Sequence, residues 1–213
     1  MVLVLFCITL ISSACVGLVN MITVEPIAKA KEAAVKAALA EVLPEFDEVD
    51  EANYPVDGLQ ITSYKATKDG AVVGYAIKTA TKNGFSGMIK MMVGFDLQGR
   101  ILNVKVLEQS ETPGLGAKIK DDNNPVLASI KGKEASQTEL CVKKDGGDID
   151  AITASTITSR AFTNGVATAV NVLSAIAGTP MLIDNATGAS STEWTAPTDS
   201  TNVILNEGEG SQK

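Results

Sequence analysis

The sequence predicts an α+β protein with an N-terminal transmembrane helix and a single domain of antiparallel sheet and flanking helices. Residues 2–24 contain no charged side chain. Between residues 59 and 108, stretches alternate apolar and polar side chains with the period of two that half-buried strands show. From Phe162 onward, apolar residues recur every three or four positions, as on one helix face. Antiparallel strands between an early and a late helix are typical of the α+β class.

Composition narrows the possible functions. The chain has 213 residues, 45% of them hydrophobic, which is ample for one core. Its formal net charge of −7 argues against nucleic acid as a partner, because binding to phosphate backbones requires a basic surface. The chain contains no histidine, which excludes histidine-based metal sites and Ser-His or Cys-His nucleophilic pairs. We therefore expect neither a metal site nor a complete set of catalytic residues.

Residues 2–24 are long enough to cross a bilayer as a helix, and we interpret residues 1–24 as a transmembrane anchor. A cleaved signal peptide with a small-x-small site at residues 28–30 is the alternative, but no basic segment precedes the run and the run exceeds the usual apolar region. Lipid attachment at Cys15 is weaker, since Ser12 stands where an aliphatic residue is expected. Lys29 and Lys31 follow the span, and charge alone would place the domain in the cytoplasm.

Three further segments follow the anchor. Residues 25–44 have apolar side chains on one side, charged residues elsewhere and Pro44 at the end, which predicts an amphipathic linker helix. Residues 45–180 form the predicted domain. Residues 181–213 are rich in Ser, Thr, Asn, Asp, Glu and Gly, which predicts a mobile polar tail.

Two hairpins are predicted within the domain. Residues 59–67 and 71–79 flank the turn Lys68-Asp69-Gly70, and residues 88–96 and 101–108 flank a turn that contains Gly99. Residues 122–133 are expected to form a short helix and a loop. Residues 138–144 are expected to form another strand, with Cys141 buried in it.

A cluster of hydroxyl side chains precedes the last predicted helix. Five of the seven residues 153–159 are Ser or Thr, and Gly178 with Pro180 is expected to end the helix. Free N–H groups and the helix dipole favour a phosphate at such an N-terminus. The alternative is that one hydroxyl only caps the helix. One cap needs one hydroxyl, and the surplus around Thr156 favours a ligand site.

This cluster resembles the flavinylation motif of the FMN-binding domain family. The matching residues are Asp150, Thr153, Ala154, Ser155, Thr156 and Thr158. In that family a flavin transferase moves FMN from FAD onto the threonine as a phosphoester, and by position the acceptor here is Thr156. The pair Ala154-Ser155 replaces the common Gly-Ala pair of the motif.

Two other segments are similar to hallmarks of the same family. The sequence ETPGLG at residues 111–116 follows a predicted strand, and its glycines permit close approach to a flat ligand. The sequence GFSG at residues 84–87 resembles a third hallmark. The family usually has a histidine two residues before the glutamate, whereas this chain has Gln109, which has no titratable side chain.

The resemblance implies a set of cofactor-binding residues and no metal ligand. Thr156 would carry covalent FMN, while Ser155, Thr158 and the helix N-terminus would bind on the phosphate side, where Ser159 also lies. The remaining implied contacts are Thr112, Leu115, Gly116, Ser86 and Gly87 at the flavin, and Asp150, which would orient the loop or serve recognition by the transferase.

Taken together, the motifs, their order and the N-terminal span resemble the G subunits of Rnf complexes, the ion-translocating ferredoxin:NAD oxidoreductases. The related C subunits of sodium-translocating NADH:quinone oxidoreductases share the motifs but are usually longer. The resemblance implies a single-pass inner-membrane subunit, with its domain on the outer face, that relays electrons through FMN. Its partners would be the other Rnf membrane subunits, a flavin transferase and the lipid bilayer. A stand-alone membrane-anchored flavoprotein reductase and a module without flavin remain open alternatives.

Overall fold

The computed structural model describes residues 1–56 and 58–177. The chain divides into two compact units, Met1–Ala37 and Ala38–Lys213. The predicted helix end at Gly178 and Pro180, and the predicted tail at residues 181–213, lie outside the described residues.

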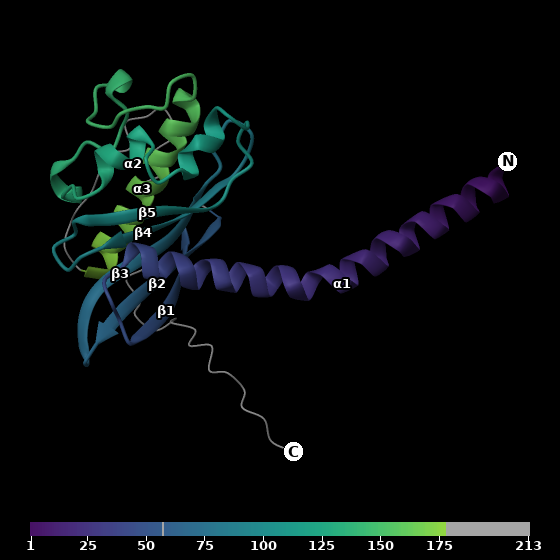
Figure 1. Ribbon diagram of the computed structural model, residues 1–213, viewed down its shortest axis with the longest axis horizontal. Coiled ribbons are helices and arrows are strands. Elements are labelled where there is room, and N and C mark those ends of the chain that lie inside the picture. The colour runs from purple at the N-terminus through teal and green to yellow at the C-terminus, as the bar shows by residue number, and fades with distance from the viewer. Residues whose placement is uncertain (57, 178–213) are drawn as a thin grey trace, which may run out of the picture. The chain divides into compact units, whose positions relative to one another are not determined.

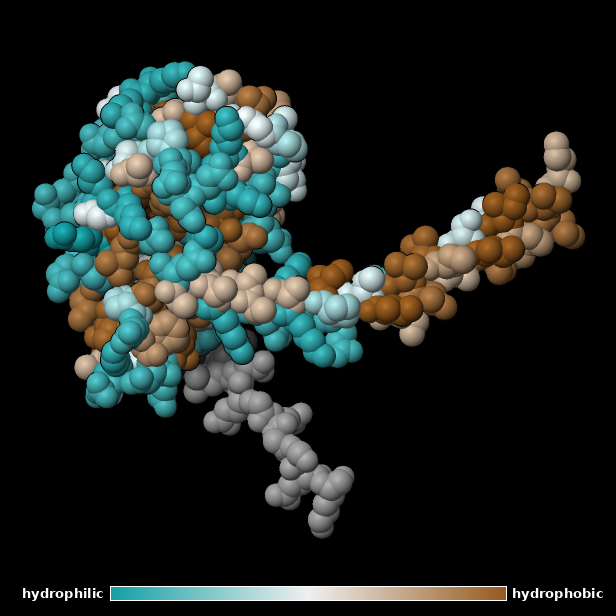
Figure 2. All heavy atoms as spheres, in the orientation of Figure 1, coloured by the Kyte–Doolittle hydropathy of each residue, from teal (hydrophilic) through white to brown (hydrophobic). Residues whose placement is uncertain are grey.

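The first unit is helical. Helix α1, Val2–Val42, continues through Pro26, so the predicted span and the predicted linker lie in one helix. Residues 2–24 would extend about 35 Å as a helix, enough for the hydrocarbon core of a bilayer. Figure 2 shows apolar side chains along this part of the chain, and its most apolar window has a mean hydropathy of 2.7 with none of it buried. An ion pair of 2.7 Å between Glu25 and Lys29 follows directly. Among the described residues, α1 is the one candidate membrane span.

The second unit contains a five-stranded antiparallel sheet in the order β1-β2-β3-β4-β5 (Figure 1). The strands are β1 Glu48–Val56, β2 Leu59–Lys68, β3 Ala71–Thr81, β4 Ile89–Phe95 and β5 Ile101–Glu108. Both predicted hairpins are confirmed, as is the α+β class. The β2–β3 turn places Asp69 and Gly70 at φ 52° and 78°, the positive values that tight hairpin turns require.

Strand β1 was not predicted. Most of its residues are at least partly exposed, it carries three acidic residues and Pro55, and it pairs only with β2 at the sheet edge. An edge strand tolerates proline and charge, because one side of its backbone has no ladder partner. The hydrophobic alternation that marked the other strands is therefore missing from this sequence.

Helix α3, Thr156–Ala177, covers one face of the sheet (Figure 1). Gly165 of α3 lies so close to Met91 of β4 that an added Cβ would be 2.7 Å from its Cε atom. Apolar side chains of β3, β4 and β5 form the core with Phe162, Val166, Ala169 and Val170 of α3. The apolar residues from Phe162 onward were predicted to share a helix face, and these four are buried.

The opposite face of the sheet packs against the end of α1. Ala38, Leu39, Val42 and Leu43 are buried. Gly94 of β4 lies against the Val42 backbone, where an added Cβ would collide with the Val42 carbonyl oxygen. Asn103 Nδ2 donates a hydrogen bond of 3.1 Å to the Glu41 carbonyl oxygen. The sheet is therefore covered on both faces.

The predicted strand at residues 138–144 is wrong. Two 3-10 turns lie in this part of the chain, η2 Ala135–Gln137 and η3 Lys143–Asp145, and Val142 makes only an isolated bridge with Ile149. Hydrogen bonds between residues close in the sequence compete with strand pairing here. Thr138 Oγ1, for example, donates a hydrogen bond of 2.8 Å to the Glu134 carbonyl oxygen. Cys141 is half-buried and outside any strand, and its partial burial raises the pKa of the thiol. The predicted helix within 122–133 is α2, Pro125–Ile130, capped by Asn124.

Candidate functional site

Helix α3 begins at Thr156, inside the hydroxyl cluster. The preceding loop is fixed by Ser159, whose Oγ donates to the Ser155 carbonyl at 3.0 Å and accepts from the Ile152 N–H at 3.0 Å. Ala154 has a φ of 62°, a left-handed conformation that strains any residue with a Cβ. The loop therefore brings Thr156 to the free N–H end of a helix, where an anion is favoured.

The ETPGLG segment forms a tight turn that starts a 3-10 helix, η1 Gly116–Lys120. The Thr112 carbonyl accepts hydrogen bonds from Leu115 N at 3.2 Å and from Ala117 N at 3.1 Å. Gly114 has a φ of 77°, the positive value that the residue after proline adopts in a type II turn. The Pro-Gly pair thus sets the direction in which the chain returns toward α3.

Glu111 joins three segments that are far apart in the sequence. Its side chain is 4% exposed. Its Oε1 accepts a hydrogen bond of 3.0 Å from Ser86 N, and its Oε2 accepts one of 2.6 Å from Thr158 Oγ1. Its own N–H donates to Gln109 Oε1 at 2.6 Å. One carboxylate therefore holds the loop at residues 84–87, the turn at 111–116 and the start of α3 together.

Two glycines allow this convergence. A Cβ on Gly116 would lie 2.7 Å from both Glu111 Oε2 and Thr158 Oγ1. A Cβ on Gly84 would lie 2.8 Å from Glu111 Oε1 and would collide with the Gly87 carbonyl oxygen. Both contacts are closer than side chains normally accept, so glycine is required for packing at these positions.

The three segments enclose a cleft of about 340 Å³. Its rim carries exposed apolar side chains, with Phe85 66%, Ile157 48% and Leu115 45% exposed. Its remaining lining residues are Glu111, Thr112, Gly116, Ala154, Ser155, Thr156 and Thr158. An apolar rim suits a flat aromatic ring, and hydroxyls at a helix N-terminus suit a phosphate.

Six of the ten cofactor-binding residues predicted from the sequence line this cleft. They are Ser155, Thr156, Thr158, Thr112, Leu115 and Gly116. The structure places the other four outside the lining. Ser86 contributes its backbone N–H to Glu111, and Gly87 follows it with a φ of 144°. Ser159 is fully buried between backbone groups, and Asp150 pairs with Lys143 at 2.8 Å.

The sequence prediction missed five residues around the cleft: Phe85, Glu111, Ala154, Ile157 and Lys144. Four of them line it, and Lys144 Nζ donates to Thr156 Oγ1 at 3.2 Å. Phe85, Glu111, Ala154 and Ile157 stand inside the recognised motifs. The signal that could have found Glu111 is its negative charge at the first position of the ETPGLG motif. Lys144 lies outside all three motifs and has no sequence signal of its own.

Next to Lys144, the turn η3 is tied to α3. Arg160 donates two hydrogen bonds to the Asp145 carboxylate, from Nε at 2.7 Å and from Nη2 at 2.6 Å. The hydrogen bond from Arg160 lowers the pKa of Asp145, and the same bond raises the pKa of Arg160. This forked pair fixes the turn geometrically, because two donors in the guanidinium plane bind the two oxygens of one carboxylate.

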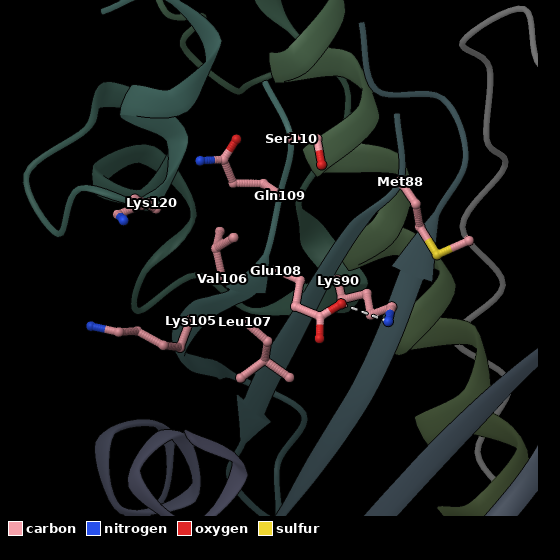
Figure 3. A pocket seen from close by; sticks show the side chains of 9 residues that line it. All are labelled: Met88, Lys90, Lys105, Val106, Leu107, Glu108, Gln109, Ser110 and Lys120. Atoms are coloured by element: carbon pink, nitrogen blue, oxygen red, sulfur yellow. Dashed lines mark hydrogen bonds and ion pairs between the residues drawn. The ribbon is translucent and has the colours of Figure 1, made fainter. Parts of the chain in front are cut away.

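A second, larger cleft of about 770 Å³ runs along β5 (Figure 3). Gln109 and Ser110 stand in its lining, next to the ion pair of 2.7 Å between Lys90 and Glu108. The other lining residues are Met88, Lys105, Val106, Leu107 and Lys120. None of the ten predicted site residues lines it. Gln109, at the position where the family resemblance predicts histidine, thus borders this cleft.

We call the cleft of about 340 Å³ the motif cleft, because the three motifs surround it. Comparison with known proteins points to the same part of the chain. The FMN-binding domain family matches residues 84–171, which include all three segments around it. The G subunit of the ion-translocating oxidoreductase complex of Shewanella piezotolerans is 31% identical over 170 residues, covering 74% of this chain and 80% of that protein. The corresponding G subunit of Photorhabdus laumondii is 35% identical over 162 residues, covering 70% and 78%. The chain belongs to the family of these G subunits.

A shorter stretch is more similar still. The G subunit of the same complex in Haemophilus influenzae is 41% identical over 104 residues, covering 47% of this chain and 50% of that protein. The domain that folds around the cleft is thus an FMN-binding domain in a protein similar to subunits of ion-translocating oxidoreductases. The lining fits the cofactor, since apolar side chains at the rim can contact the isoalloxazine ring and the start of α3 can bind the phosphate.

Proposed function

We propose that this protein is the electron-transfer subunit of a membrane-bound ion-translocating ferredoxin:NAD oxidoreductase complex, and that its FMN is attached to Thr156 by a phosphoester. The observation that carries the proposal is the position of Thr156. Its hydroxyl stands at the first residue of α3 and lines a cleft with an apolar rim. Bound there, FMN would supply the redox chemistry, while the protein supplies position and electrostatic environment.

The attachment step is a phosphoryl transfer. Thr156 Oγ1 would attack the phosphorus atom of the FMN half of FAD, and the bond from that phosphorus to the bridging oxygen would break. AMP leaves with this oxygen, and the hydroxyl proton passes to a base of the transferase. The step changes no oxidation state. Thr156 is half-buried and Ile157 beside it is 48% exposed, so a transferase can reach the hydroxyl.

The resulting protein would pass electrons between redox centres of the complex. Residues 1–24 would anchor it in the inner membrane, residues 25–44 would link the anchor to the FMN-binding domain, and the domain would stand on the outer face. The other membrane subunits of the complex and a flavin transferase would be its partners. Covalent attachment would prevent loss of the cofactor, because an open cleft of about 340 Å³ covers only part of a flavin.

The test is intact-mass spectrometry of the full-length protein co-expressed with a flavin transferase. The parent should gain one FMN and retain flavin fluorescence after denaturation, whereas Thr156→Val should gain nothing. Thr168→Val is the matched control, because Thr168 is half-buried on the same helix, stands outside the three motifs and does not line the cleft. It should be modified like the parent. An unmodified parent, beside a control protein that is flavinylated, would refute covalent attachment.

A further inference from the structure

Lys144 lies in a turn whose neighbouring charges are already paired. In η3, Lys143 Nζ contacts Asp150 Oδ1 at 2.8 Å, and Asp145 accepts both hydrogen bonds of Arg160. Gly146, with a φ of 93°, ends the turn, and its N–H donates to the Lys143 carbonyl at 3.2 Å. The backbone that carries Lys144 is therefore held from both sides.

Lys144 itself points to the acceptor hydroxyl. Its Nζ donates to Thr156 Oγ1 at 3.2 Å. Within the described part of the chain, no carboxylate lies within ion-pair distance of Lys144, although its charge helps to lower the pKa of the adjacent Asp145. Lys143 and Arg160, the neighbouring cations, both face carboxylates. Of these three positive charges, Lys144 is the one directed at the position where FMN would be attached.

We propose that Lys144 is the cation that binds the FMN phosphate on Thr156 and aligns the incoming phosphoryl group during attachment. The inference rests on the proposed function. A phosphorus atom bonded to Oγ1 stands one bond from the atom that Lys144 already contacts, so its non-bridging oxygens lie within reach of the ammonium group.

The charge balance supports this role. A phosphodiester between FMN and threonine keeps one negative charge. The N-terminus of α3 offers a fractional positive charge, whereas Lys144 offers a full one that can form a charge-assisted hydrogen bond. The helix N-terminus and Lys144 together thus neutralise the negative charge of the phosphodiester more completely than the helix N-terminus alone. Lys144 acts as a positioning residue before the transfer and as a phosphate ligand after it.

The experiment uses the full-length protein in detergent, with FAD and a purified flavin transferase. Parent, Lys144→Met, Lys144→Arg and Lys143→Met are followed by intact mass over time. Lys143→Met is the matched control, since it removes one positive charge from the same turn but leaves the contact to Thr156. We expect Lys144→Met to slow FMN incorporation about tenfold, the size expected for one charge-assisted hydrogen bond. Lys143→Met and Lys144→Arg should stay within about threefold of the parent.

A second readout separates phosphate binding from recognition by the transferase. For each protein, the melting temperature of the unmodified form is subtracted from that of the fully flavinylated form. This difference should shrink in Lys144→Met and persist in Lys143→Met. Equal rates for the two methionine variants would overturn the proposal, as would a slow Lys144→Met whose melting-temperature difference is unchanged. Both results leave Thr156 attachment intact, whereas an unmodified parent would refute the proposed function itself.

Discussion

The domain carries two clefts that differ in size and in construction. The cleft along β5 measures about 770 Å³, and most of its lining comes from consecutive residues of one strand and the two that follow it. The motif cleft measures about 340 Å³, and its lining comes from three segments around residues 85, 111–116 and 154–158. The smaller cleft contains the family motifs. Convergence of distant segments, and not volume, distinguishes the cleft that we propose as the functional site.

The two clefts also differ in how their charges are held. Glu111 in the motif cleft is 4% exposed and accepts hydrogen bonds from two other segments. Glu108 in the β5 cleft is 42% exposed in its side chain and faces Lys90 across the sheet. A buried carboxylate with fixed donors determines the geometry around it, whereas an exposed ion pair contributes little to it. Substitutions in the two clefts should therefore have unequal effects.

The largest effect is expected from Glu111→Ala. This change leaves the buried Thr158 hydroxyl and the Ser86 N–H without their acceptor, which should lower the free energy of unfolding by about 2–3 kcal/mol. It should also stop the three segments from meeting, so that FMN incorporation on Thr156 is lost. Denaturant unfolding and intact mass measure the two consequences.

Two variants control for this result. Glu111→Gln keeps an oxygen that can accept from Ser86 N and should retain part of the incorporation. Glu108→Ala removes the carboxylate from the β5 cleft and should cost less than about 1 kcal/mol. If Glu108→Ala destabilised the protein as much as Glu111→Ala, the proposed difference between the clefts would be wrong.

The fold was predictable where one face of each strand is buried and a turn residue separates two strands. The hairpin around Asp69 and Gly70 meets both conditions. The edge strand β1 was missed because its exposed, acidic sequence shows no alternation. Residues 138–144 were wrongly predicted as a strand, since Leu140 and Val142 are buried but stand in loop and turn structure held by local hydrogen bonds. Apolar residues indicate burial, and only their spacing over several positions indicates the element.

The site was predictable to the extent that its residues stand in contiguous motifs. Thr156 and the turn residues Thr112, Leu115 and Gly116 were found in this way, and all four line the cleft. The clamping role of Glu111 and the position of Lys144 depend on contacts between segments far apart in the chain. Lys144 is 12 positions from its partner Thr156, and Glu111 is 47 positions from Thr158. No local pattern encodes such pairs.

A smaller effect, of opposite sign, is expected from Ala154→Gly in the motif cleft. Ala154 has a φ of 62°, and the left-handed conformation costs a residue with a Cβ about 1–2 kcal/mol. Glycine removes this strain but loses more chain entropy on folding, so the net gain should be about 0.5–1 kcal/mol. Thermal unfolding measures it. Ala151→Gly, in the same loop without a positive φ, is the control and should not stabilise the protein. A destabilised Ala154→Gly would refute the strain at this position.

The smallest effect is expected from Lys90→Met in the β5 cleft. Its ion pair with Glu108 is partly exposed, at 37% and 42% of the two side chains, so the change should alter the free energy of unfolding by about 0.5 kcal/mol or less. FMN incorporation on Thr156 should match that of the parent, because Lys90 does not line the motif cleft. Intact mass and denaturant unfolding check both statements. Loss of incorporation in Lys90→Met would mean that the larger cleft takes part in flavin binding, and that convergence alone does not locate the site.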